Sequence, residues 1–164
     1  MTALVAGIDP GMTGALALVE VDTLRAVEIV DFPVLRVGAA GKHTADEAGL
    51  FEILSQWRDV GCVLVVYESQ QAYPKQGLSS AFSLGVTFGV VCATIAAVGI
   101  AREPVSPRTW KKDAGLGSDK AGSRAAALRI FPLARDQLGR KKDEGRAEAL
   151  LIAAYAAKRW RGMR

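Results

Sequence analysis

The chain has 164 residues, of which half are apolar and 23% are charged, and this composition predicts one soluble domain with a hydrophobic core. Its most apolar segment, residues 86–100, is interrupted by threonines and glycines and is too short to span a bilayer. The N-terminal MTALVAGID lacks the basic region and the cleavage site of a secretion signal. Cys62 and Cys92 lie in apolar runs without metal-ligand spacing, which indicates buried thiols in a reducing, cytoplasmic compartment.

The net charge of +4 is unevenly distributed along the sequence. Residues 1–101 contain five Lys or Arg against ten Asp or Glu, whereas residues 102–142 contain eleven against four. An acidic part with isolated carboxylates, followed by a basic part, favours a metal site that faces a polyanion. A basic surface without a specific role is the alternative interpretation.

The first part of the chain predicts an antiparallel meander. Apolar runs at 4–8, 15–21 and 26–34 are strand candidates, and DPGMTG supplies the turn between the first two. After a loop at GAAGKH, the segment TADEAGLFEILSQWRDVG predicts a helix with Thr44 as N-cap and Glu47 completing a capping box. The run CVLVVYES that follows is typical of a strand buried on both faces.

The second half predicts three helices and one more strand. A long helix covers roughly residues 79–97, REPVSPRTWKK gives a short strand and its exit, SDKAGSRAAALRIFP gives a helix capped by Ser118 or Asp119, and EGRAEALLIAAYAAKRW gives the terminal helix. We therefore expect an α/β fold over residues 1–164. Its mixed five-stranded sheet, with three antiparallel and two parallel strands, would be flanked by helices.

Acidic side chains occur where a purely structural sequence would not need them. Asp9 ends the first strand and Glu68 the central one, and the ends of neighbouring strands meet at one edge of an α/β sheet. Asp143, Glu144 and Glu148 lie at the start of the terminal helix, where residues at i and i+4 share a face. Crowded carboxylates repel one another unless a cation neutralises them, and all-oxygen ligands select Mg²⁺ or Mn²⁺.

Most of these acids also have a structural interpretation. Asp9 fits an Asx turn, and Glu68 fits a loop cap or an ion pair with a nearby lysine. Asp143 fits the N-cap of the last helix, and Glu144 fits its first turn. Glu148 has the weakest alternative, because it lies between alanines in an otherwise apolar helix.

Four segments follow one another as the motifs of RuvC-like Holliday junction resolvases do: GIDPGMTGALALV, VLVVYESQ, SSAFSLGVTFGVVCATIAAVGIAREPVSPRTWKK and GRAEALLIAAY. Nearly the whole chain resembles this family of the RNase H-like superfamily. GRAEALLIA is similar to variants common among phage-encoded members, whereas the cellular enzyme usually has two acids three residues apart in this helix. Gly145 stands at that position here, which leaves the fourth ligand open between Asp143 and Glu144.

The resemblance implies a crossover junction endodeoxyribonuclease with two Mg²⁺ ions, for which Mn²⁺ can substitute. Asp9 would bridge the ions, Glu68 would hold one of them, and Glu148 with Glu144 or Asp143 would hold the other. The expected substrate is a four-way DNA junction in a bacterial cell or a phage-infected host. Such a protein would act as a homodimer.

The resemblance and the basic half together predict the DNA contacts. Tyr73 stands where the family uses an aromatic side chain that stacks on an unpaired base. Phosphate contacts are expected from the following residues: Lys75, Arg108, Lys111, Lys112, Lys120, Arg124, Arg140, Lys141 and Lys142. Trp110 also fits simple packing beneath the sheet edge. The small-residue face of the helix at 79–97, beside Phe82 and Phe88, fits either a dimer contact or ordinary packing on the sheet.

Three other functions are compatible with parts of this pattern. A nuclease of the same fold could act on flaps or other branched DNA. DPGMTG also resembles the phosphate-binding hairpin of actin-like ATPases, although a second phosphate loop is missing from the sequence. A non-catalytic DNA-binding module is the third alternative, and the complete set of acids argues against it.

Overall fold

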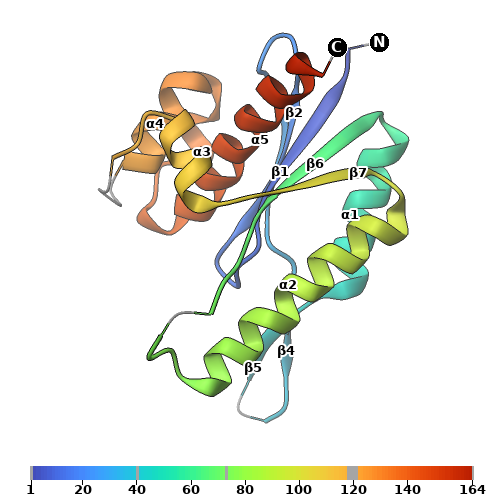
Figure 1. The fold of residues 1–164 in the computed structure, drawn as a ribbon, viewed down its shortest axis with the longest axis vertical. Coiled ribbons are helices and arrows are strands. Elements are labelled where there is room, and N and C mark those ends of the chain that lie inside the picture. Colours follow the sequence, from blue (N-terminus) through green and yellow to red (C-terminus); the bar gives the residue numbers. More distant parts are fainter. Residues whose placement is uncertain (1, 40, 73, 118–121, 164) are drawn as a thin grey trace.

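The structure is a computed structural model that describes residues 2–39, 41–72, 74–117 and 122–163. A mixed five-stranded sheet with the order β3-β2-β1-β6-β7 lies at its centre (Figure 1). Its strands are β1 (Leu4–Asp9), β2 (Ala15–Glu20), β3 (Ala26–Asp31), β6 (Cys62–Glu68) and β7 (Ala101–Val105). Neighbouring strands pair antiparallel from β1 to β3, whereas β6 and β7 run parallel to β1. The predicted fold class is confirmed.

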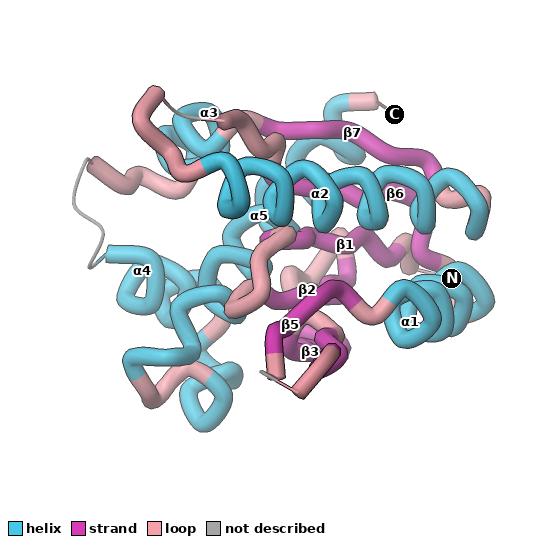
Figure 2. The backbone as a smooth tube through the Cα atoms, turned by 90° about the horizontal axis from the view of Figure 1, so that it is seen from below, coloured by secondary structure: helices cyan, strands magenta, loops and turns pink. Residues whose placement is uncertain are grey.

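Helices cover both faces of the sheet (Figure 2). One face packs against α1 (Glu47–Asp59) and α2 (Leu78–Val98). The other face packs against α5 (Glu144–Gly162), with α3 (Pro107–Asp113) and α4 (Ser123–Ile130) beside it. Two short 3₁₀ helices lie between α4 and α5: η2 (Pro132–Gln137) and η3 (Lys141–Asp143). Side chains of β1 and β2 alternate between the two cores, as the period of a strand requires.

The close approach of α5 to the sheet depends on small residues. A Cβ atom on Gly7 of β1 would lie 2.3 Å from the backbone oxygen of Ala149 and 2.3 Å from the nitrogen of Ala153. Only glycine therefore fits at this point of β1. The first turns of α5 are thereby fixed against β1 and β2, and this contact carries the acids of α5 to the ends of those strands.

The segment between β3 and α1 differs from the sequence prediction. The third strand ends at Asp31, and a two-stranded hairpin follows, formed by β4 (Val34–Val37) and β5 (Lys42–Ala45). Thr44, predicted as a helix cap, instead pairs with Leu35 in this hairpin. The N-cap of α1 is Asp46, whose Oδ1 accepts the backbone N–H of Gly49 at 3.0 Å. Aspartate caps a helix as well as threonine does, and a β-branched threonine suits a strand.

The segment after β7 is a helix rather than the exit of a strand. Ser106 caps α3 by accepting the backbone N–H of Thr109 at 3.1 Å, and Pro107 occupies the first turn, where its missing N–H costs nothing. The predicted caps Ser118 and Asp119 lie outside the described residues. The described part of α4 begins at Ser123, with Gly122 as N-cap.

Helix α2 extends the helix predicted at 79–97 by one residue at each end. It has 21 residues, and by length and composition alone it could cross a membrane, with 22% of its most apolar window buried. Its inner side packs on α1, and Phe88 lies 5.8 Å from the ring of Tyr67. Its outer side is apolar and open, with Phe82 73% exposed. A single helix of this kind is weak evidence for a membrane.

Candidate active site

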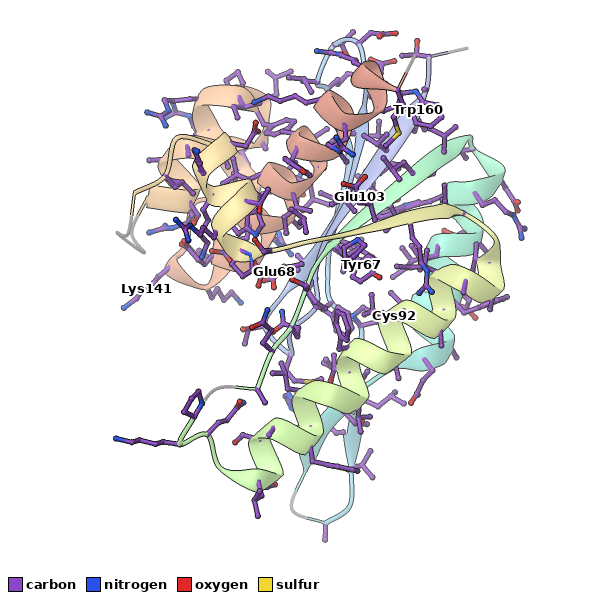
Figure 3. The ribbon with its side chains drawn as sticks, viewed as in Figure 1. Tyr67, Glu68, Cys92, Glu103, Lys141 and Trp160 are labelled. Atoms are coloured by element: carbon purple, nitrogen blue, oxygen red, sulfur yellow. The ribbon has the colours of Figure 1, made fainter. Side chains whose placement is uncertain are left out.

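Two of the predicted acids lie at the same edge of the sheet. Asp9 ends β1 and Glu68 ends β6, and these strands are parallel neighbours with Ile8 opposite Tyr67. Figure 3 shows Glu68 at the end of β6, beside the start of α3. The strand order therefore brings the two carboxyl groups together, as the sequence predicted.

Helix α5 adds Glu144 and Glu148 to this edge. Both line a cavity of about 330 Å³ together with Asp9 and the lysines of η3; its full lining is Asp9, Thr13, Lys141, Lys142, Glu144, Gly145 and Glu148. A Cβ atom on Gly145 would lie 2.3 Å from the backbone oxygen of Thr13 in the hairpin between β1 and β2. The hairpin therefore leaves no room for a side chain at this position, three residues before Glu148.

Burial and neighbouring carboxylates raise the pKa of Asp9 and of Glu68. Burial raises the pKa of Asp9 to about 7, and the charges of Glu148 and Glu68 add to the increase. Burial also raises the pKa of Glu68, while a hydrogen bond from Trp110 opposes the rise. Desolvation and nearby like charges both disfavour an ionised carboxylate. Perturbed groups that converge on a cavity are typical of a functional site.

Each glutamate of the site already has a partner in the protein. The indole N–H of Trp110 donates to Glu68 Oε2 at 2.7 Å. Lys111 Nζ lies 3.5 Å from Glu148 Oε1, which also accepts a hydrogen bond from Ser123 at 3.2 Å. These contacts come from α3 and from the start of α4, so both elements help to build the site.

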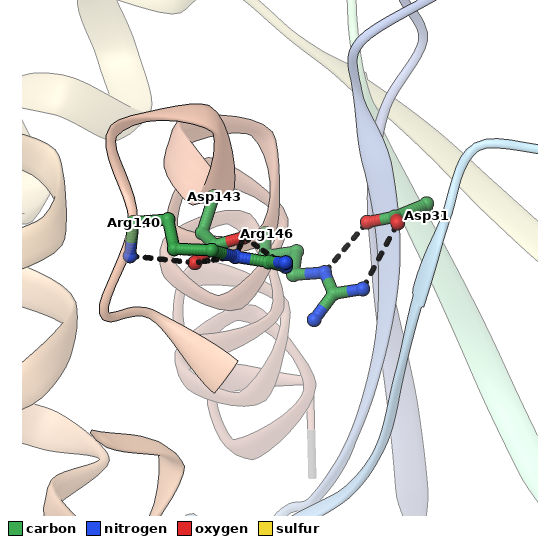
Figure 4. Close-up of polar contacts among 4 residues, drawn as sticks. All are labelled: Asp31, Arg140, Asp143 and Arg146. Carbon is green, nitrogen blue, oxygen red and sulfur yellow. Dashed lines mark hydrogen bonds and ion pairs between the residues drawn. The ribbon is translucent and has the colours of Figure 1, made fainter. Parts of the chain in front are cut away.

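Asp143 stands at the N-cap of α5 and is paired with an arginine. Its side chain is only 2% exposed, and both oxygens are held by Arg140, whose backbone N–H donates at 2.7 Å and whose guanidinium donates at 2.8 Å (Figure 4). Hydrogen bonds from Arg140 lower the pKa of Asp143 to about 2. This pair closes η3 where α5 begins, and Glu144 rather than Asp143 lines the cavity.

A second ion pair lies beside the first one. Arg146 of α5 donates to both oxygens of Asp31 at the end of β3, at 2.6 and 2.9 Å (Figure 4). Hydrogen bonding to Arg146 lowers the pKa of Asp31. Asp31, which pairs with Arg146, and Asp143, which pairs with Arg140, are called the arginine-paired acids below.

The donor set of the site suits a hard divalent cation. Asp9, Glu68, Glu144 and Glu148 offer carboxylate oxygens, the ligands that Mg²⁺ prefers. Burial raises the pKa of Asp9, and the charges of Glu148 and Glu68 add to the rise. Within the described ranges, no three Asp, Glu, His or Cys side chains lie close enough together to hold one ion. The four side chains would therefore have to move from their present positions to share ions.

The predicted DNA contacts are only partly gathered at the site. Lys141 and Lys142 line the cavity, Lys111 lies over the ring of Trp110 at 5.0 Å, and Arg124 Nε lies 3.3 Å from Glu144 Oε2. Three further predicted residues are exposed and distributed over α3 and the loop before α2: Lys75, Arg108 and Lys112. Tyr73 and Lys120 lie outside the described residues, and Arg140 is paired with Asp143.

The sequence did not predict the hydrogen bond between Trp110 and Glu68. Trp110 is completely buried, which confirms the packing alternative and shows that its ring is not a surface for stacking on a base. The pair Ser106–Pro107 is a helix-start signal that would have placed Trp110 on the inner face of a short helix.

Comparisons with known proteins support the fold. Two solved structures of RuvC from Thermus thermophilus are similar to the chain over nearly its whole length. One, RuvC in complex with a Holliday junction substrate, has a TM-score of 0.66 and 22% identity and covers 98% of this chain and 96% of its own. The other has a TM-score of 0.60 and 24% identity and covers 97% and 96%. No protein-family model and no curated protein sequence matches the chain. The protein therefore has a RuvC-like fold.

Proposed function

We propose that this protein is a Mg²⁺-dependent, structure-selective endonuclease that resolves four-way DNA junctions by paired hydrolysis of phosphodiester bonds. The observation that carries the proposal is the position of Asp9 at the end of β1, where burial, with the charges of Glu148 and Glu68 adding to it, raises the pKa of Asp9 to about 7. A protein has little reason to keep such repulsion unless a cation relieves it. The RuvC-like fold supports the same conclusion, since one of the similar structures is RuvC with a Holliday junction substrate.

In this proposal, one set of site residues binds the metal ions and another set binds the DNA. Asp9, Glu68, Glu144 and Glu148 would hold two Mg²⁺ ions, which supply activation of a water molecule and stabilisation of the leaving oxygen. Lys141 and Lys142 line the same cavity and would bind the phosphates on either side of the cleaved bond. Asp143 is excluded from our ligand set because Arg140 holds both of its oxygens.

We propose a homodimer that uses the open face of α2, because two strands of a junction must be cut. Leu78, Phe82 and Val86 are 90%, 73% and 40% exposed on this helix. Leu35 and Val37 of the neighbouring hairpin are 45% and 53% exposed. An apolar patch of this kind is typical of a contact between proteins. Phe88, which was predicted for the same contact, faces Tyr67 and is not part of it.

The test is a cleavage assay that compares four-way, three-way, flap and linear duplex DNA with Mg²⁺ or Mn²⁺. We expect paired, symmetric nicks in the four-way substrate only. Cleavage of flaps with equal efficiency would replace this proposal with a general branched-DNA nuclease. Tight junction binding without any cleavage would favour a non-catalytic module, and thermal stabilisation by ATP would favour an ATPase.

A further inference from the structure

Trp110 makes a hydrogen bond that packing alone does not require. Its side chain has no exposed surface, and its Nε1–H donates to Glu68 Oε2 at 2.7 Å. A buried indole needs an acceptor, but a backbone carbonyl would serve as well as a carboxylate. Here the acceptor is one of the acids at the edge where β1 and β6 end.

The hydrogen bond occupies one oxygen of Glu68 and leaves the other more open. Among the described residues, Oε1 receives a longer hydrogen bond of 3.3 Å from Gln70 in the loop after β6. A glutamate has three rotatable side-chain bonds, and an anchored Oε2 removes most of that freedom. The indole itself can only donate, so Trp110 neither binds a cation nor transfers a proton to substrate.

The position of Trp110 in α3 links the acids of two elements. Lys111, the next residue, lies over the Trp110 ring at 5.0 Å and reaches Glu148 Oε1 at 3.5 Å. Consecutive residues of one short helix thus contact the acid of β6 and the acid of α5. A fixed indole orients Glu68 directly and also supports the lysine beside Glu148.

We propose that Trp110 is a positioning residue that holds Glu68 through its indole N–H so that Oε1 is presented to a divalent cation. This inference rests on the proposed metal-dependent function. Groups that hydrogen-bond to metal ligands commonly change metal affinity by about 10- to 100-fold when they are removed. The effect can be measured without DNA and without catalysis.

The chain contains a matched control for this hydrogen bond. Trp57 of α1 is 1% exposed, and its Nε1–H donates to Glu28 Oε2 at 2.7 Å, the same distance as in the Trp110 pair. Glu28 lies in β3, on the side of β2 away from β1 and β6. Trp57→Phe removes the same kind of bond and a similar volume, but at a place unrelated to the proposed ions.

The first experiment measures Mn²⁺ binding by calorimetry for the wild-type chain, Trp110→Phe and Trp57→Phe, each in the full-length protein. We expect affinity to fall by about tenfold or more in Trp110→Phe and to stay within about twofold in Trp57→Phe. In a Glu68→Gln background, Trp110→Phe should cause no further loss, because its effect acts through that carboxylate. The inference would be overturned if Trp110→Phe bound Mn²⁺ as tightly as the wild type. It would also be overturned if Trp110→Phe reduced Mn²⁺ affinity as much in the Glu68→Gln background as in the wild type.

A second experiment uses only the wild-type chain and covers the case in which Trp110→Phe fails to fold. The indole N–H resonances of the tryptophans are followed by NMR during a Mg²⁺ titration. We expect the Trp110 resonance to shift while that of Trp57 stays in place. Mg²⁺ binding that leaves the Trp110 resonance unmoved would overturn the inference alone. Absence of any Mg²⁺ or Mn²⁺ binding would overturn the proposed metal-dependent function and this inference with it.

Discussion

Two groups of acids lie near the ends of β1, β3 and β6, and their electrostatics are opposite. The arginine-paired acids, Asp31 and Asp143, have lowered pKa values because guanidinium groups hold their oxygens. At the site, Asp9 and Glu68 have raised pKa values because they are buried and face other carboxylates. The first group has its counter-charge within the protein, whereas for Asp9 and Glu68 the charge of Lys111 lowers the pKa without overcoming the rise that burial causes. An acid that the fold leaves partly uncompensated is the better candidate for binding a cation.

The largest effect is expected from a substitution that removes an acid of the site and leaves the arginine-paired acids unchanged. Asp9→Asn removes the acid between Glu68 and Glu148 and should lower the cleavage rate by about 10³-fold or more, because an amide is a poor bridging ligand. Binding of a four-way junction should persist. The cleavage rate and the binding affinity are measured on synthetic four-way junctions, the affinity by gel shift. A mutant that still nicks the junction with Mg²⁺ would refute the role of Asp9.

Moving α5 away from the hairpin tests whether the site depends on close packing. Gly145→Ala places a Cβ atom 2.3 Å from the backbone oxygen of Thr13, and a contact with backbone is relieved only by shifting α5. We expect a loss of about 2–4 kcal/mol of unfolding free energy, measured by denaturant titration. The control is Gly162→Ala in the same helix, where an added Cβ meets nothing within 4 Å and stability should hold. Equal stabilities of the two variants would contradict this account of Gly145.

The pH dependence of stability should separate the two groups directly. The pKa of Asp9 rises from 3.8 to about 7 on folding, so the native state binds the proton more tightly than the unfolded state does. The free energy of unfolding of the metal-free protein should therefore fall as pH rises between those values, by about 2–4 kcal/mol. Asp9→Asn should lack this component, and saturating Mg²⁺ should suppress it in the wild type. If the unfolding free energies of wild type and Asp9→Asn changed with pH in the same way, the raised pKa of Asp9 would be contradicted.

The opposite sign is expected for Asp143. Its folded-state pKa is depressed to about 2, so it stabilises the protein above its unfolded pKa, and this contribution disappears as pH falls through about 2. Asp143→Asn should lower Tm at neutral pH by several degrees, as should Arg140→Gln, while Mn²⁺ affinity stays near the wild-type value. A loss of Mn²⁺ binding in Asp143→Asn without a change in Tm would return Asp143 to the ligand set.

The smallest effect concerns the lysines that line the cavity. Lys142→Ala should reduce the log–log salt slope of junction binding by about 0.9, the amount expected for one phosphate contact. Lys158→Ala is the control, because Lys158 pairs with Asp113 at the other end of α5. An unchanged slope in Lys142→Ala would remove this residue from the DNA surface.

The sheet was predictable from the sequence because its signals are local. Apolar runs located four strands of the sheet, and acids at the ends of two such runs indicated the candidate site before any contact was known. The hairpin of β4 and β5 was missed because Thr44 and Glu47 imitate a capping box, and the true cap, Asp46, lies between them. The choice between Asp143 and Glu144 depends on which side chain Arg140 reaches, and the hydrogen bond from Trp110 depends on how α3 packs. Contacts of this kind are set by tertiary structure and leave little trace in the spacing of residues.

A crystal of the protein soaked in Mn²⁺ tests the central claim most directly. The account predicts ions at the edge where β1 and β6 end, within coordination distance of Asp9, Glu68 and Glu148, with Glu144 turned toward them and Asp143 still held by Arg140. Ions bound elsewhere, or these carboxylates remaining too far apart to share an ion at saturating Mn²⁺, would contradict it.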